Sequence, residues 1–91
     1  MKIGVLGAGQ LGRMLALAGI PHGHSFRFWD PTANSPASCL GEHIVAGFDQ
    51  LDSVRRFVEG LDVVTYEFEN VPVALVQAIN EHVAVYPPVK A

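Results

Sequence analysis

A glycine-rich turn between an apolar strand and a helix opens this chain. Residues 2–6 form a short apolar run, and Gly7-Ala8-Gly9-Gln10-Leu11-Gly12 follows at once. In this position the first glycine permits a tight turn, the second lets a ligand approach the backbone, and the third lets the helix pack closely on the strand. The helix start presents N–H groups and a positive dipole end to an anion or polar group. The alternative is a strand–helix turn that binds nothing.

Strand and helix patterns alternate along the rest of the chain. Such alternation predicts a five-stranded parallel sheet of order 3-2-1-4-5, with right-handed crossovers and helices on both faces. The segment between the second and third strands is too short for a full helix, so we expect a loop or a single turn there. The predicted strands are residues 2–6, 25–30, 42–46, 62–66 and 83–86, and the predicted helices are residues 10–20, 51–59 and a third from about residue 72.

Helical spacing predicts which side chains each helix buries and which residues cap it. Asp49 or Asp52 could cap the second helix, Asn70 should cap the third with Pro72 in its first turn, and His82 should end it. The predicted inward side chains are Leu11, Met14, Leu15 and Ala18 in the first helix, Leu51, Val54, Phe57 and Val58 in the second, and Leu75, Val76 and Ile79 in the third.

Two carboxylates follow the fourth predicted strand, in the run Tyr66-Glu67-Phe68-Glu69-Asn70-Val71-Pro72. Ligands of open parallel sheets bind at the carboxyl ends of the strands. Glu67 and Glu69 alternate with Phe68, so an extended chain would direct both carboxylates to one side. Such a pair suits ribose hydroxyls, an amine or a metal, and suits a phosphate badly. The alternative is a pair of solvated loop acids.

Two further residues follow the second predicted strand. Asp30 lies 18 residues after Gly12, near the spacing at which an acid holds a ribose hydroxyl in nicotinamide-binding folds. This makes the NAD(P)-binding domain of an oxidoreductase the main rival interpretation. Because Pro31 follows, Asp30 could instead cap the loop. The hydroxyl of Ser35, on the same loop, suits a phosphate, and the alternative is an ordinary turn.

Composition excludes several classes of protein. The 91 residues are 49% hydrophobic and 16% charged, which is typical of one packed globular domain. The net charge of −3 and the lack of a basic cluster argue against nucleic-acid binding. The apolar runs are far shorter than the roughly 20 residues of a membrane span. No signal peptide is visible, and the single Cys39 fits a reducing cytoplasm. The four histidines lack metal-site spacing.

Three segments, in order, resemble one family: residues 3–14, Asp30-Pro31 with Ser35-Pro36-Ala37, and residues 64–72. The family is 5-(carboxyamino)imidazole ribonucleotide synthetase, an ATP-grasp enzyme of bacterial and fungal purine biosynthesis. The resemblance covers the whole chain but only the N-terminal third or less of a family member. It implies that residues 1–91 are a single Rossmann-like, pre-ATP-grasp domain that binds substrate, and that the ATP-grasp and C-terminal domains are absent from this chain.

The resemblance also implies a reaction and a division of labour. The family joins ATP, bicarbonate and aminoimidazole ribonucleotide, whose exocyclic amine attacks carboxyphosphate or CO₂. ATP and Mg²⁺ would bind in the later domains, so we expect no catalytic residue, metal ligand or cofactor here, and no activity from this chain alone. The full-length enzyme would be a cytoplasmic homodimer, with no nucleic-acid or membrane partner. The implied ribonucleotide-binding residues are Gly9, Gln10, Leu11, Ser35, Glu67, which would hold the ribose hydroxyls, and Asn70.

Overall fold

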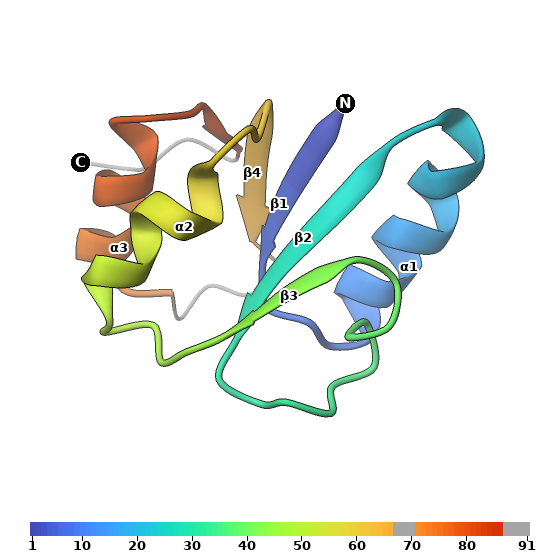
Figure 1. The fold of residues 1–91 in the computed structure, drawn as a ribbon, viewed down its shortest axis with the longest axis horizontal. Helices are drawn as coiled ribbons and strands as arrows, with labels where there is room; N and C mark the ends of the chain where they lie inside the picture. The colour runs from blue at the N-terminus through green and yellow to red at the C-terminus, as the bar shows by residue number, and fades with distance from the viewer. Residues whose placement is uncertain (67–70, 87–91) are drawn as a thin grey trace.

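Five parallel strands form the centre of the protein, whose computed structural model describes residues 1–66 and 71–86. They pair in the order β3-β2-β1-β4-β5, and every pairing is parallel (Figure 1). The predicted sheet is therefore confirmed in order and direction. The strands are Lys2–Leu6 (β1), Ser25–Asp30 (β2), Glu42–Val45 (β3), Val63–Tyr66 (β4) and Val85–Tyr86 (β5).

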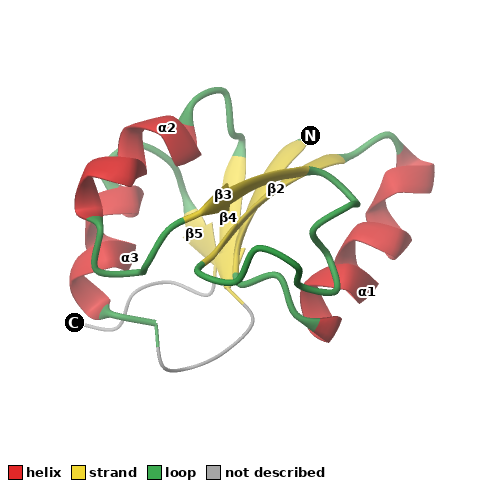
Figure 2. Ribbon diagram, turned by 60° about the horizontal axis from the view of Figure 1, so that its bottom comes forward, coloured by secondary structure: helices red, strands yellow, loops and turns green. Residues whose placement is uncertain are grey.

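Helices cover both faces of this sheet. Helix α1 (Gln10–Gly19) lies on one face, and α2 (Val54–Val58) and α3 (Val73–Asn80) lie on the other (Figure 2). Short 3-10 turns, Ile20–His22 (η1) and Leu51–Ser53 (η2), follow α1 and precede α2. The connection from β2 to β3 consists of turns, as its length predicted.

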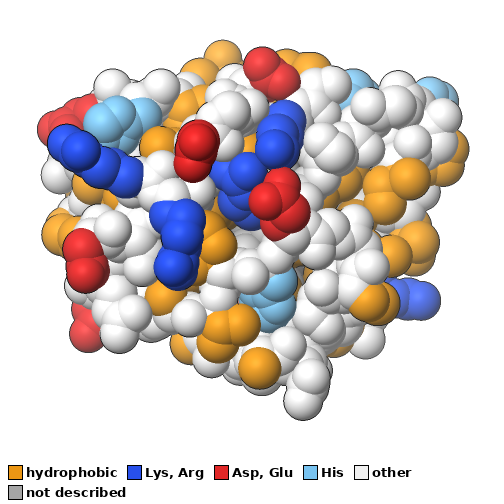
Figure 3. All heavy atoms as spheres, in the orientation of Figure 1, with side chains coloured by type: hydrophobic (Ala, Val, Ile, Leu, Met, Phe, Trp, Pro, Cys, Tyr) orange, Lys and Arg blue, Asp and Glu red, His pale blue; other side chains and the backbone are white. Residues whose placement is uncertain are grey.

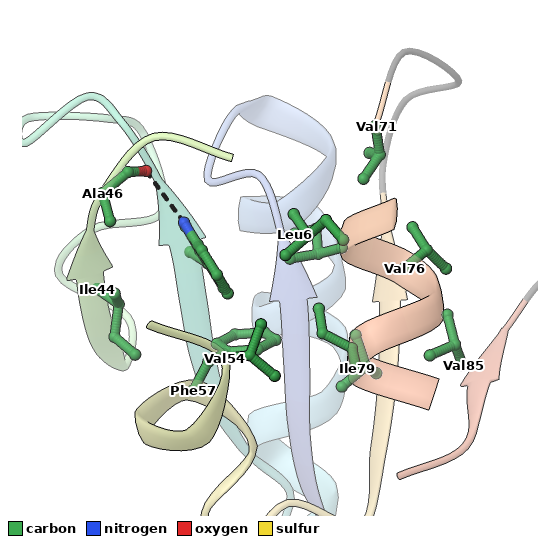
Figure 4. Close-up of a cluster of buried hydrophobic side chains, with 12 residues drawn as sticks. Leu6, Ile44, Ala46, Val54, Phe57, Val71, Val76, Ile79 and Val85 are labelled. Atoms are coloured by element: carbon green, nitrogen blue, oxygen red, sulfur yellow. Dashed lines mark hydrogen bonds between the residues drawn. The ribbon is translucent and has the colours of Figure 1, made fainter. Parts of the chain in front are cut away.

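The larger apolar core lies between the sheet and the pair α2 and α3. Figure 4 shows Leu6 of β1 in this cluster, together with Phe57 of α2 and Ile79 of α3. The indole of Trp29 meets the ring of Phe57 edge-on at a centroid distance of 5.3 Å. Its Nε1 donates a hydrogen bond of 3.0 Å to the Ala46 carbonyl, so this buried polar group is satisfied.

The smaller core lies under α1, and it overturns the predicted inward face of that helix. The only buried residues of α1 are Gly12 and Ala16, whereas Leu11, Met14, Leu15 and Ala18 are exposed. The reason is that β2 places two large aromatic side chains, Phe26 and Phe28, on this face of the sheet. A methyl group at Gly19 would lie 2.6 Å from the ring of Phe26, and Phe28 is fully buried in the same cluster. The helix therefore packs through its small residues.

The other helix ends also differ from the predictions. The second helix is a 3-10 turn followed by the short α2, Leu51 is exposed, and the N-cap of α2 is Ser53 rather than Asp49 or Asp52. For α3 the N-cap is Pro72, whose carbonyl accepts from the N–H of Leu75 at 3.1 Å. None of these caps uses a side-chain hydrogen bond, because turns of backbone lead into the helices. The last residue of α3 is Asn80 rather than His82.

One charged side chain is buried in the described part of the chain. Arg27 of β2 is 6% exposed and donates hydrogen bonds of 2.7 Å to the carbonyls of Phe57 and Glu59. Phe57 lies in the last turn of α2 and Glu59 is its C-cap residue. Carbonyls at the end of a helix lack partners within it, so Arg27 caps this end of α2. Its guanidinium also contacts the carboxylate of Glu42 at 3.2 Å. Hydrogen bonds from Arg27, and then from Lys2, hold the pKa of Glu42 below its ordinary value.

Candidate functional site

The carboxyl ends of β1, β2 and β4 lie side by side at one edge of the sheet. Leu6, the last residue of β1, is the register partner of both Trp29 in β2 and Tyr66 in β4. The strand order reverses between β1 and β4, since the chain runs outward from β1 to β3 and then returns to β4. In open parallel sheets this reversal leaves a crevice that ligands use. The glycine turn therefore begins at the expected position for a site.

The glycine turn bends the chain sharply from β1 into α1. Gly7 has a φ of 106°, a conformation that favours glycine, and its N–H donates to the Trp29 carbonyl at 2.7 Å. Gly9 is the N-cap of α1 and makes no side-chain capping bond, and the first turn of α1 contains no acidic residue. The positive end of the helix dipole thus has no carboxylate from the helix itself beside it.

Asp30 fixes the shape of this turn. One carboxylate oxygen accepts a hydrogen bond of 2.9 Å from the Ala8 N–H, and the other accepts one of 2.8 Å from the Thr32 N–H. Both oxygens are therefore engaged by backbone, and the interpretation of Asp30 as a cap is confirmed. The sequence signal for this role is an acid directly before a proline. In the structure, the N–H two residues after the acid, that of Thr32, donates back to its carboxylate.

The loop between β2 and β3 lies against the same turn. The N–H of Ala37 donates to the Ala8 carbonyl at 2.9 Å, a contact that the sequence analysis missed. Ser35 is half-buried in this loop, and its hydroxyl donates to the Thr32 carbonyl at 3.2 Å. Ser35 thus lies two residues before Ala37, the residue whose hydrogen bond joins this loop to the glycine turn. Its predicted contact with a phosphate stays a prediction.

The structure thus gathers part of the predicted site. Gly9, Gln10 and Leu11 head α1, with Gln10 and Leu11 exposed, and the Ser35 loop lies against the turn before them. Glu67, Glu69 and Asn70 lie outside the described residues, so their predicted roles are untested.

Two other expectations concern metals and membranes. Across residues 1–66 and 71–86, no three His, Cys, Asp or Glu side chains are grouped as a metal site requires. Among the helices in these ranges, none has both the length and the apolar character needed to cross a bilayer.

Comparison with known proteins decides the family. A family model for the ribonucleotide synthetase preATP-grasp domain matches residues 1–91. The chain belongs to this family. The assignment decides against the rival NAD(P)-binding domain of an oxidoreductase, and it agrees with an Asp30 that braces the turn.

Several relatives are similar to this preATP-grasp domain. N5-carboxyaminoimidazole ribonucleotide synthase of Pseudomonas aeruginosa is 51% identical over 87 residues, which cover 96% of this chain and 24% of the relative. The crystal structure of N5-carboxyaminoimidazole ribonucleotide synthetase from Thermus thermophilus aligns with a TM-score of 0.91 at 53% identity, covering 96% of this chain and 24% of that one. The preATP-grasp domain described here therefore spans about a quarter of the length of these relatives.

A third relative was solved with ligands. The N5-carboxyaminoimidazole synthase of Aspergillus clavatus, in complex with ADP and 5-aminoimidazole ribonucleotide, aligns with a TM-score of 0.78 at 34% identity. The alignment covers 92% of this chain and 23% of that protein. The same fold thus occurs in an enzyme that binds both molecules.

Proposed function

We propose that this domain binds the ribonucleotide substrate of an ATP-dependent ligase of purine biosynthesis. The ligase would convert aminoimidazole ribonucleotide and bicarbonate to 5-(carboxyamino)imidazole ribonucleotide. The observation that carries the proposal is the match of all 91 residues to the ribonucleotide synthetase preATP-grasp domain. Its likeness to the Aspergillus clavatus enzyme, which was solved with the ribonucleotide, supports it further.

The ribonucleotide would lie across the carboxyl ends of β1 and β4. Gly9 would let it approach the backbone at the head of α1, and Gln10 and Leu11 would contact it from the first turn. Ser35 would lie on its phosphate side. Glu67 would accept hydrogen bonds from the ribose hydroxyls, with Asn70 nearby. Charge-assisted hydrogen bonds of this kind fix orientation as well as affinity.

The role of the domain would be to hold and aim the exocyclic amine. ATP, when bound in the rest of a family-length protein, supplies the phosphoryl group that activates bicarbonate as carboxyphosphate. The amine nitrogen then bonds to the carboxyl carbon, directly or after release of CO₂, and phosphate leaves. We propose that ATP and Mg²⁺ bind outside residues 1–91, in ATP-grasp and C-terminal domains, and that the whole enzyme is a cytoplasmic homodimer.

Kinetics of a full-length enzyme carrying Glu67→Gln test the site. Losing a charge-assisted hydrogen bond removes on the order of 1.5–3 kcal/mol, so the KM for the ribonucleotide should rise about tenfold or more. The KM for ATP should stay unchanged because ATP binds elsewhere. Glu69→Gln is the matched control and should have a smaller effect. A larger effect of Glu69→Gln would reverse the assignment within the pair, and no effect of either would make both acids structural.

The isolated chain tests the division of labour. We expect the 91-residue protein to release no phosphate from ATP when the ribonucleotide is added, while the full-length enzyme does so under the same conditions. A ribonucleotide-dependent ATPase activity of the isolated chain would contradict the proposal.

A further inference from the structure

The carboxylate of Asp30 joins two segments that are far apart in sequence. One oxygen accepts the N–H of Ala8, in the glycine turn before α1, and the other accepts the N–H of Thr32, at the start of the loop from β2 to β3. The first segment leads into Gly9 and Gln10, and the second carries Ser35. One side chain at the carboxyl end of β2 thus connects the two segments.

The glycine turn is held against this loop at a second point. The carbonyl of Ala8 accepts a hydrogen bond of 2.9 Å from the N–H of Ala37, and both alanines are fully buried in the cluster under α1. Ala8 is therefore fixed through its N–H, its carbonyl and its methyl group. Because Gly9 follows directly, the backbone at the head of α1 has a defined position relative to the loop.

The loop itself depends on Asp30 for its shape. Thr32 is bonded at its N–H by Asp30 and at its carbonyl by the hydroxyl of Ser35, so a chain of hydrogen bonds runs from the carboxylate to Ser35. Residues 31–41 contain no charged side chain, and in Figure 3 the charged side chains gather on the α2 side of the view rather than over this loop. No ion pair made by residues 31–41 can thus fix the loop in place of these bonds.

We propose that Asp30 is a positioning residue for ribonucleotide binding, which sets the spacing between the head of α1 and Ser35. The inference rests on the proposed function, in which both segments contact the ribonucleotide. Both carboxylate oxygens already accept backbone N–H groups, so Asp30 acts through the two segments and not by touching the ligand. A site that is ordered before the ligand arrives loses less conformational freedom on binding, and the affinity rises accordingly.

This role requires a carboxylate at the position of Asp30. An asparagine offers one accepting oxygen and one donating NH₂ group, so it can satisfy Ala8 or Thr32 but not both. A glutamate keeps two accepting oxygens but places them one methylene farther from the backbone. Asp30→Asn therefore tests the two acceptors, and Asp30→Glu tests their position.

Steady-state kinetics of the full-length enzyme is the experiment. Asp30→Asn should raise the KM for the ribonucleotide about tenfold, because a misplaced contact segment weakens binding, and should leave the KM for ATP unchanged. Asp30→Glu should raise the ribonucleotide KM as well. A purely structural role would instead reduce the amount of folded enzyme, which lowers the apparent kcat and leaves both KM values as they are. That result would overturn the proposal.

Ile79→Val is the matched control for lost stability. It removes one methylene group from a fully buried side chain in the core on the other face of the sheet, and should lower thermal stability to a comparable extent. Its ribonucleotide KM should equal that of wild type. A ribonucleotide KM that rises equally in Ile79→Val and Asp30→Asn would show a general effect of destabilisation, and would overturn the proposal.

A double-mutant cycle with Ser35→Ala tests the connection between the two segments. Ser35→Ala should raise the ribonucleotide KM in wild type but add little in the Asp30→Asn background, where Ser35 is already misplaced. Fully additive effects, or a wild-type KM in Ser35→Ala, would overturn the proposal. A ribonucleotide KM that Glu67→Gln raises and Asp30→Asn leaves unchanged would overturn this inference alone, whereas no change in any of the three variants would overturn the proposed site as well.

Discussion

The two faces of the sheet are packed in opposite ways. On the α3 side the helix brings large side chains, and Leu75, Val76 and Ile79 are buried against Leu6 and its neighbours. On the α1 side the sheet brings the bulk, with Phe26 and Phe28 under a helix that contributes Gly12 and Ala16. Helix α1 thus buries its small residues and exposes its large ones, so its two surfaces differ in what they contribute to the core. The inner one sets how closely α1 approaches the sheet, and the outer one adds little to the core.

The largest expected difference between the two faces is in the stability that a leucine contributes. Leu75→Ala in α3 should lower the free energy of unfolding by about 2–5 kcal/mol, because it removes a fully buried side chain and leaves a cavity. Leu17→Ala in α1 makes the same change on an exposed side chain and should stay within about 0.5 kcal/mol. Urea unfolding at a concentration that keeps the chain monomeric measures both. Equal losses would show that the faces do not differ.

Adding side-chain volume to α1, instead of removing it, tests the difference between the buried and exposed sides of this helix. Ala16→Leu should destabilise the protein by about 1–3 kcal/mol, because Ala16 is fully buried on the side of α1 that packs on the sheet and the added carbons have no room. Ala18→Leu adds the same atoms to the exposed side of the same helix and should leave the monomer nearly unchanged. Thermal unfolding of the pair is the measurement. A neutral Ala16→Leu would mean that α1 can move away from the sheet.

The head of α1 is held by hydrogen bonds rather than by apolar contact. Asp30→Asn replaces one accepting oxygen with a donor, so the N–H of Ala8 or of Thr32 loses its partner. We expect a loss of about 1–2 kcal/mol, since the site is partly buried and the lost bond is charge-assisted. Asp52→Asn, on the exposed η2 turn, is the control and should have little effect. Equal behaviour of the two variants would remove the bracing role of Asp30.

The smallest expected effect is a pH dependence on the α2 side of the sheet. The pKa of Glu42 is lowered chiefly by its hydrogen bond with Arg27, so the contact stabilises the folded chain at neutral pH and is lost as the pH falls through that lowered pKa. Wild type should therefore be slightly more stable than Glu42→Gln at neutral pH, and the difference should shrink in acid. The effect is small because the Glu42 side chain is 59% exposed. A difference that stays constant with pH would contradict it.

Local patterns predicted the sheet but not the direction in which α1 faces. The apolar runs and the glycine turn were sufficient for the strands and their order, since both signals are contained in short segments. Leu11, Met14 and Leu15 have the spacing of a buried face, and periodicity alone cannot distinguish an apolar face that meets the sheet from one that stays exposed in this domain. The decisive fact is the bulk of Phe26 and Phe28, which lie on another element.

The candidate site also has features that short sequence patterns predict and features that they do not. Gly9, Gln10 and Leu11 could be placed from the motif, and Asp30 could be weighed as a cap. The hydrogen bonds that shape the region join residues far apart in sequence, such as Ala8 with Asp30 and Ala8 with Ala37, and no local pattern predicts them. The same holds for Arg27, whose partners in α2 follow it by about a third of the chain.

The position of β1 within the sheet has a consequence for synthesis. Among the described strands β1 is made before the others and is the central one, and it pairs with β2 on one side and with β4 on the other. Its first partner follows after α1 and the short η1 turn, but Val63–Tyr66 emerges only after β2, β3 and α2 have been made. Until then one side of β1 exposes unpaired backbone in a half-built sheet. Because closing so long a loop is slow and an open strand edge can pair wrongly, the docking of β4 is the step at which a nascent chain is most exposed to misassembly.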